Sequence, residues 1–147
     1  MIPKSLVECV RLPDAPGVKG PMAGILSAMR WAPRGSWLVA ACDLPQLSAG
    51  ALRWLLSTRA PGVWAALPRL PGAANVEPLL AHYDFRARRL LEEMAAGGNF
   101  RLNDLAADAK VISPAPPPRL ARAWRNVNTA ADLADLDSAG GAPDRPA

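Results

Sequence analysis

The sequence is poor in the side chains that bind zinc or form disulfides. Its 147 residues include two cysteines and one histidine, and Cys9 and Cys42 stand far apart with no C-x-x-C spacing. Zinc sites and redox pairs need such residues in clusters, so both kinds of site are disfavoured. Because Cys9 and Cys42 lie in apolar runs, we expect both to be small buried hydrophobic residues.

Long apolar runs are also missing. None approaches the roughly 20 residues that a membrane helix requires, and the N-terminus MIPKSLVECV lacks the apolar centre of a secretory leader. Half of the residues are hydrophobic and a fifth are charged, which is typical of one globular domain. We therefore expect a cytoplasmic protein without membrane contact, with a single domain over 1–137 and a disordered tail over 138–147.

The positive charge is modest and dispersed. The net charge is +4, mostly from arginines that do not form a block, and only 5% of the residues are aromatic. Nucleic-acid binding surfaces usually gather their basic residues and interleave stacking aromatics, so no nucleic-acid partner is expected. A weak positive field instead favours an anionic small molecule.

Strand-like and helix-like patterns alternate along the chain, which predicts an α/β protein with a parallel sheet. The expected strands cover 6–12, 37–42, 63–67, 79–83 and 110–113, and the expected helices cover 22–31, 49–57, 84–96, 101–107 and 129–136. Local residues mark several helix ends: Pro21 at a first position, Ser48 as an N-cap, Gly97 at a C-terminus, and Thr129 with Asp132 as a capping box.

Several conspicuous side chains are most simply structural. His82 lies in an apolar strand and is expected to be a satisfied core histidine. Two arginine–glutamate pairs, Arg88 with Glu92 and Arg89 with Glu93, have the i,i+4 spacing of a solvated helix face. The tryptophans are expected in the core; they are Trp31, Trp37, Trp54, Trp64 and Trp124.

One carboxylate stands at the tip of the apolar strand WLVAACD. Asp43 ends this strand, and Asp14 occupies the matching position after the preceding predicted strand. Ligands of parallel α/β sheets bind beyond the carboxyl ends of the strands, where a carboxylate can hold Mg²⁺. Aspartate is equally common as a turn-forming residue after a strand. The position alone leaves the two interpretations balanced.

Four short motifs decide between them. WLVAACDLPQLS resembles the strand-C-D-x-P segment of the molybdenum cofactor guanylyltransferase family, and GPMAGI (Gly20–Ile25) is similar to its G-P-L-A-G-I loop. EPLLAHY (Glu77–Tyr83) is similar to its [HEQ]-P-L-x-A-x-Y strand, and RNVNTAADL (Arg125–Leu133) resembles its N-x-N-T-P-E-D-L element. The four matches occur in the family's order and span most of the chain.

The resemblance implies a Rossmann-like, three-layer nucleotidyltransferase fold. It also implies transfer of GMP from GTP to the phosphate of molybdopterin, with release of pyrophosphate and with Mg²⁺ as cofactor. Asp43 then matches the metal-binding, catalytic acid. Asp14 matches an acid of the nucleotide site, and Gly20, Pro21 and Gly24 match the loop around the nucleotide. Asn126 and Asn128 match residues on the molybdopterin side.

One family element has no counterpart in this sequence. Family members begin with a strand and a loop of the type L-A-G-G-x-S-x-R-M-G, followed by a lysine, which cradles the triphosphate; no such segment occurs here, and no G-x-x-x-x-G-K-[ST] motif either. The resemblance therefore implies a fold lacking its first strands, with an exposed sheet edge. We expect weak GTP binding and either marginal stability or self-association through that edge.

Three functions remain open on these residues. The first is GMP transfer to molybdopterin, and the second is a related enzyme of the same group that uses CTP or modifies another phosphate. The third is a non-catalytic remnant that docks on a partner through its sheet edge and the proline-rich spacer Pro114–Pro118.

Overall fold

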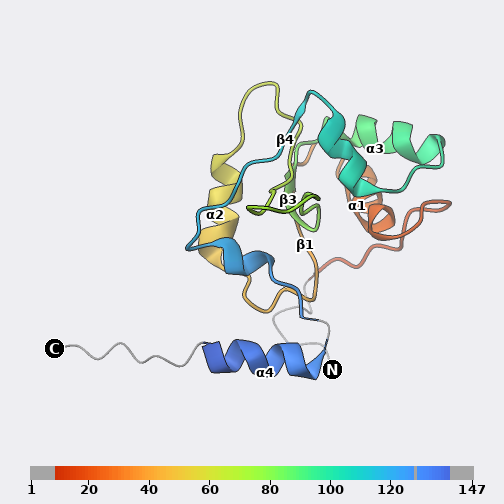
Figure 1. Cartoon of the computed structure of the whole chain (residues 1–147). Helices are drawn as coiled ribbons and strands as arrows, with labels where there is room; N and C mark the ends of the chain where they lie inside the picture. Colours follow the sequence, from red (N-terminus) through yellow and green to blue (C-terminus); the bar gives the residue numbers. More distant parts are fainter. Residues whose placement is uncertain (1–8, 128, 140–147) are drawn as a thin grey trace.

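The computed structural model describes residues 9–127 and 129–139, and it is a three-layer α/β fold (Figure 1). The central sheet has four strands in the order β1-β3-β2-β4. Their bounds are Trp37–Ala40 for β1, Ala65–Ala66 for β2, Leu80–Tyr83 for β3 and Val111–Ile112 for β4. The predicted fold class is confirmed, although each strand is shorter than expected.

The sheet is mixed rather than parallel. Strands β2 and β4 run parallel, whereas β3 is antiparallel to both of its neighbours, with Trp37 opposite Tyr83 in β1 and Ala65 opposite Tyr83 in β2. The expectation of a parallel sheet is therefore wrong at β3. The segment between β2 and β3 contains no helix to carry the chain across the sheet, so the chain returns in the opposite direction.

Helices cover both faces of the sheet. Helices α1 (Pro21–Trp31) and α3 (Ala87–Ala96) contact each other on one face, and α2 (Ala49–Ser57) lies on the other (Figure 1). Successive side chains of β3 point to opposite faces of the sheet, as in any β-strand. Ala81 and Tyr83 join the α1–α3 core, and Leu80 joins the core beneath α2.

Local sequence explains where these helices begin. Pro21 is the first residue of α1, and the Ser48 side chain accepts a hydrogen bond from the Ala51 N–H at 3.2 Å to cap α2. Asp84 accepts from the Arg86 N–H at 3.0 Å just before α3, although the N-cap position itself is Arg86. The three helix starts are thus predicted to within a few residues.

The remaining elements are short. A 3₁₀ segment covers Leu102–Ala107, and a second one covers Ala121–Trp124. Helix α4 (Ala130–Ala139) lies apart from the three layers (Figure 1), and it extends beyond the expected end at residue 136. Its capping box is confirmed, since the Thr129 N–H donates to Asp132 and the Asp132 N–H donates to the Thr129 hydroxyl. The expected disordered tail over 138–147 is wrong at residues 138 and 139, which belong to α4, and residues 140–147 lie outside the described part of the chain.

Several expectations about single elements are wrong. Residues 9–12 of the predicted first strand are not in a strand, and residues 6–8 lie outside the described part of the chain. Cys9 and Cys42 are both exposed rather than buried, and Cys42 lies in the turn that follows the end of β1 at Ala40. Trp31 is 57% exposed in the last turn of α1, where it contacts the Trp37 ring instead of entering the core.

The predicted side-chain pairs also differ in part. Arg89 pairs with Glu93 at 3.0 Å as expected, but Glu92 pairs with Arg30 of α1 at 2.8 Å rather than with Arg88. His82 is buried as predicted, yet its Nε2 has no hydrogen-bond partner, so it is not satisfied. In the ranges 9–127 and 129–139, no helix is long and apolar enough to cross a membrane.

Candidate functional site

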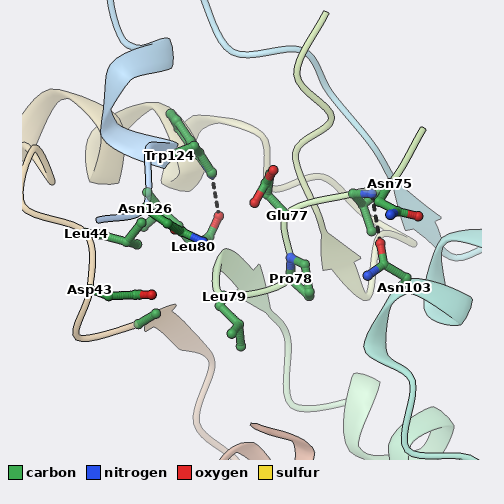
Figure 2. A pocket seen from close by; sticks show the side chains of 12 residues that line it. Asp43, Leu44, Asn75, Glu77, Pro78, Leu79, Leu80, Asn103, Trp124 and Asn126 are labelled. Carbon is green, nitrogen blue, oxygen red and sulfur yellow. Dashed lines mark hydrogen bonds between the residues drawn. The ribbon is translucent and has the colours of Figure 1, made fainter. Parts of the chain in front are cut away.

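A cavity of about 340 Å³ opens at the carboxyl end of β1. Figure 2 shows that its walls come from the loop after β1, the segment that leads into β3, and the stretch after the Ala121–Trp124 turn. Its polar lining residues are Asp43, Asn75, Glu77, Asn103 and Asn126. We call this cavity the Asp43 pocket.

Asp43 and Asn126 meet in this pocket although they are distant in sequence. Asp43 is half-buried, and its backbone carbonyl accepts a hydrogen bond from the Val127 N–H at 3.1 Å. This bond anchors the chain beside Asn126 to the loop after β1. The structure therefore brings together two of the predicted site residues, and Asn128 lies outside the described residues.

Trp124 fixes one wall of the pocket. It is 3% exposed, and its indole N–H donates to the Leu80 carbonyl at 2.9 Å (Figure 2). Its ring packs edge-on against Trp54 of α2, with centroids 5.6 Å apart. A buried indole with its N–H satisfied has little freedom to move, so this wall is rigid.

Glu77 and Asn103 line the pocket from the segment before β3 and from the 3₁₀ segment Leu102–Ala107. The Asn103 side-chain oxygen accepts from the Val76 N–H at 2.9 Å, and the Glu77 N–H donates to the Pro68 carbonyl at 2.7 Å. Burial raises the pKa of the Glu77 carboxyl above its usual value. Glu77 is recognised from the sequence only as part of a motif. Asn75 and Asn103 are not predicted, because their placement depends on contacts between distant segments.

The other predicted site residues form a separate group at the start of α1. Asp14 and Gly24 are exposed, and a Cβ added at Gly24 would lie 3.9 Å from an Asp14 carboxylate oxygen. Gly20 has a φ of 64°, in the left-handed region that favours glycine. Together with Pro21, these residues surround the N-terminus of α1 and do not line the Asp43 pocket.

The electrostatics of the Asp43 pocket are acidic. Among the residues described, those that line it include two carboxylates and no lysine, arginine or histidine. The described chain also contains no cluster of three or more His, Cys, Asp or Glu side chains arranged to hold a metal. A lone carboxylate such as Asp43 is compatible with Mg²⁺, which typically takes one or two protein carboxylates and completes its octahedron with waters and substrate phosphates.

Helices on both faces of a mixed sheet, with polar side chains beyond the carboxyl end of β1, define a three-layer α/β protein with a candidate site at the strand ends. The chain belongs to the MobA-like NTP transferase domain family, whose sequence profile matches residues 3–110.

Curated relatives carry the name probable molybdenum cofactor guanylyltransferase. The protein from Thermococcus gammatolerans is 33% identical over 124 residues, which covers 80% of this chain and 61% of the relative. The protein from Bacillus licheniformis is 27% identical over 121 residues, which covers 81% of this chain and 61% of the relative. The chain thus spans about three fifths of the length of these relatives.

Solved structures show the same fold. The molybdopterin-guanine dinucleotide biosynthesis protein A from Archaeoglobus fulgidus matches with a TM-score of 0.67 and 27% identity, over 82% of this chain and 62% of that one. A putative protein from Aquifex aeolicus matches with a TM-score of 0.64 and 19% identity, over 75% of this chain and 57% of that one, and this likeness concerns the fold alone.

Proposed function

We propose that this chain takes part in transferring GMP from GTP to the phosphate of molybdopterin, with Mg²⁺ as cofactor and pyrophosphate as the second product. The observation that carries the proposal is the meeting of Asp43 and Asn126 in one pocket beyond the carboxyl end of β1. The names of the relatives from Thermococcus gammatolerans and Archaeoglobus fulgidus support the choice of nucleotide and acceptor.

In this proposal Asp43 is the metal-binding, catalytic residue. A bound Mg²⁺ supplies charge neutralisation between the phosphates of the two substrates. Phosphoryl transfer requires mainly alignment and charge stabilisation from the protein, so one half-buried carboxylate contributes more than a covalent nucleophile would. Asn126 offers an amide donor to the acceptor phosphate without adding charge, and Asn128 is proposed for the same side.

The nucleotide site is proposed to include the N-terminus of α1. The first turn of this helix contains no acidic side chain, and backbone N–H groups at such an end favour phosphate. Gly20 leaves this end uncrowded, because nothing lies within 4 Å of a Cβ built there, and Pro21 and Gly24 are proposed to line the same site. Asp14 beside Gly24 is proposed to accept hydrogen bonds from the nucleotide.

We also propose a cellular location and an association state for the protein. Cys9 and Cys42 are exposed and not in a disulfide, as is typical of proteins in a reducing compartment, which supports a cytoplasmic location. Self-association through the edge of β1 is also proposed.

The test is direct product analysis. The purified chain is incubated with molybdopterin, Mg²⁺ and either GTP or CTP, and the dinucleotide and pyrophosphate are quantified, with the Archaeoglobus fulgidus relative as a parallel sample. We expect a guanine dinucleotide and stoichiometric pyrophosphate. Preferential use of CTP would establish the related cytidylyl activity instead. Absence of both products, when the relative is active, would contradict the proposal.

A further inference from the structure

Glu77 is a half-buried carboxylate for which the proposed chemistry has no role. It lines the Asp43 pocket, and none of the described residues forms a hydrogen bond or ion pair with its side chain. Taking a carboxylate partly out of water without donors costs free energy. A group kept in this state inside a pocket is suited to a ligand that brings its own N–H donors.

The backbone around Glu77 is held in place on both sides. The Glu77 N–H donates to the Pro68 carbonyl at 2.7 Å, the preceding Val76 N–H donates to Asn103, and the following residue is Pro78, whose φ is fixed. In Figure 2 the Glu77 carboxylate points toward the Trp124 side of the pocket, whereas Asp43 enters from the loop after β1. The two carboxylates therefore serve different parts of the cavity.

The lining restricts what such a ligand can be. The described residues of the pocket offer no cationic side chain, so a phosphate would be repelled at Glu77. A carboxylate accepts two parallel N–H donors in its plane. The pyrimidine edge that carries a 2-amino group, a ring N–H and a 4-oxo group presents such a pair, whereas adenine and cytosine place an acceptor beside their amino group.

We propose that Glu77 binds the 2-amino-4-oxo-pyrimidine edge of a fused heterocycle, the edge that guanine and pterins share. This assignment rests on the proposed function, since it assumes that the Asp43 pocket receives one of the two substrates of that reaction. The heterocycle lies toward Glu77 and Trp124, and the phosphate of the same substrate lies toward Asp43 and Asn126. Glu77 is therefore a specificity-determining residue.

Two pairs of probes test the assignment and distinguish guanine from a pterin as the heterocycle that Glu77 binds. The pairs are GTP with inosine triphosphate, which lacks the amino group, and pterin with lumazine, which carries an oxo group in its place. Binding of each is measured by calorimetry to the wild type, to Glu77→Gln and to the control Glu93→Gln on the exposed face of α3. Thermal melting of each variant verifies folding.

We expect the wild type to bind the amino-bearing member of one pair about 10-fold or more tightly than its analogue. Glu77→Gln brings that ratio close to one, and Glu93→Gln leaves it unchanged. An effect in the first pair identifies guanine, and an effect in the second identifies a pterin. The assignment would be overturned if both members of each pair bound equally well, or if no probe bound. It would also be overturned if the affinity ratio of the wild type were unchanged in Glu77→Gln. Nucleotidyl transfer that depends on Asp43 would still stand, because it is measured by pyrophosphate release.

Discussion

At the scale of the residue, the buried His82 and the half-buried Glu77 share a preference for the neutral state. Burial raises the pKa of Glu77, and burial together with the positive charge of Arg59 lowers the pKa of His82. His82 lies in β3, the strand between β1 and β2, opposite Leu38 of β1 and Ala66 of β2. Both groups therefore couple the stability of the sheet and the pocket to pH.

The first prediction concerns His82, the only histidine in the chain. Its folded-state pKa is lowered, so the neutral imidazole supports folding above the unfolded value of about 6.5. Stability is lost as the pH falls below that value, at up to about 1.4 kcal/mol per pH unit. Urea unfolding of the wild type and of His82→Leu at pH 7.5, 6.5 and 5.5 measures this. An identical pH slope in the two proteins would contradict it.

The second prediction concerns Glu77 and has the opposite sign. Its folded-state pKa is raised, so the ionised form is disfavoured by folding, and this cost grows as the pH rises through the folded value. We expect Glu77→Gln to melt at a higher temperature than the wild type at pH 7.5, with the difference shrinking toward pH 4.5. A lower melting temperature of the variant at pH 7.5 would show that Glu77 has a stabilising partner.

At the scale of the element, the helix that follows the Asp43 loop depends on one hydroxyl. Ser48 caps α2 through the Ala51 N–H, and the preceding turn is closed by a bond from the Leu47 N–H to the Leu44 carbonyl at 3.2 Å. This turn leads directly from the pocket into the helix. The cap therefore stabilises the start of α2, just after the loop that contains Asp43.

We expect Ser48→Ala to reduce the free energy of unfolding by about 1 kcal/mol, because one backbone N–H of the first turn loses its acceptor. Ser48→Asp retains an acceptor at this position and is expected to unfold within a few tenths of a kcal/mol of the wild type. Chemical denaturation of both variants provides the comparison. Equal loss in the two variants would indicate that the hydroxyl acts through packing rather than through the cap.

The contact between α1 and α3 combines an exposed ion pair with a buried core. Arg30 donates two hydrogen bonds to Glu92, at 2.9 and 2.8 Å, but both side chains are about 40% exposed. Leu91, the preceding residue of α3, is fully buried. The neighbouring positions thus allow the two kinds of contact to be compared in one helix.

We expect Glu92→Gln to cost less than about 1 kcal/mol, and less still at high salt, because exposed ion pairs are screened by solvent. Leu91→Ala is expected to cost about 2–5 kcal/mol through lost burial and the cavity that remains. Unfolding free energies at low and high ionic strength provide the test. A cost of Glu92→Gln equal to that of Leu91→Ala would contradict this ranking.

At the scale of the whole molecule, β1 is an edge strand within the described residues. The Ala41 N–H donates to the Leu79 carbonyl at 2.7 Å, and the antiparallel register continues through Val39 opposite Ala81. The alternation of an antiparallel ladder then directs the backbone groups of Leu38 and Ala40 away from β3. Such a row of backbone groups is a template for pairing with another chain.

We expect the protein to self-associate through this edge in a concentration-dependent manner. Ala40→Lys places a charge on an exposed position of β1 and should shift the protein toward monomer, whereas Ala96→Lys at the exposed end of α3 should not. Sedimentation velocity over a concentration series distinguishes the variants. A monomeric wild type at every concentration, or equal association of the Ala40→Lys variant, would contradict the expectation.

Local chemistry made much of the fold predictable. Pro21, Ser48 and Gly97 each act within one helical turn, and the apolar run before Asp43 identified β1 from sequence alone. What escaped prediction depends on distant segments. The Asn103 side chain reaches Val76, 27 residues away, and Arg30 reaches Glu92 across two helices. The direction of β3 depends on the path of the preceding loop, which has no local sequence mark.

Asp43 is the residue on which the proposed function depends most, and one comparison tests its role directly. Asp43→Asn is compared with Asp135→Asn, which makes the same charge change at an exposed position of α4, by measuring pyrophosphate release with GTP, molybdopterin and Mg²⁺. We predict a loss of about 100-fold or more for Asp43→Asn, as when a charge-stabilising group is removed from an active site, and a wild-type rate for Asp135→Asn. A rate for Asp43→Asn within about threefold of the wild type, well short of that loss, would contradict the account.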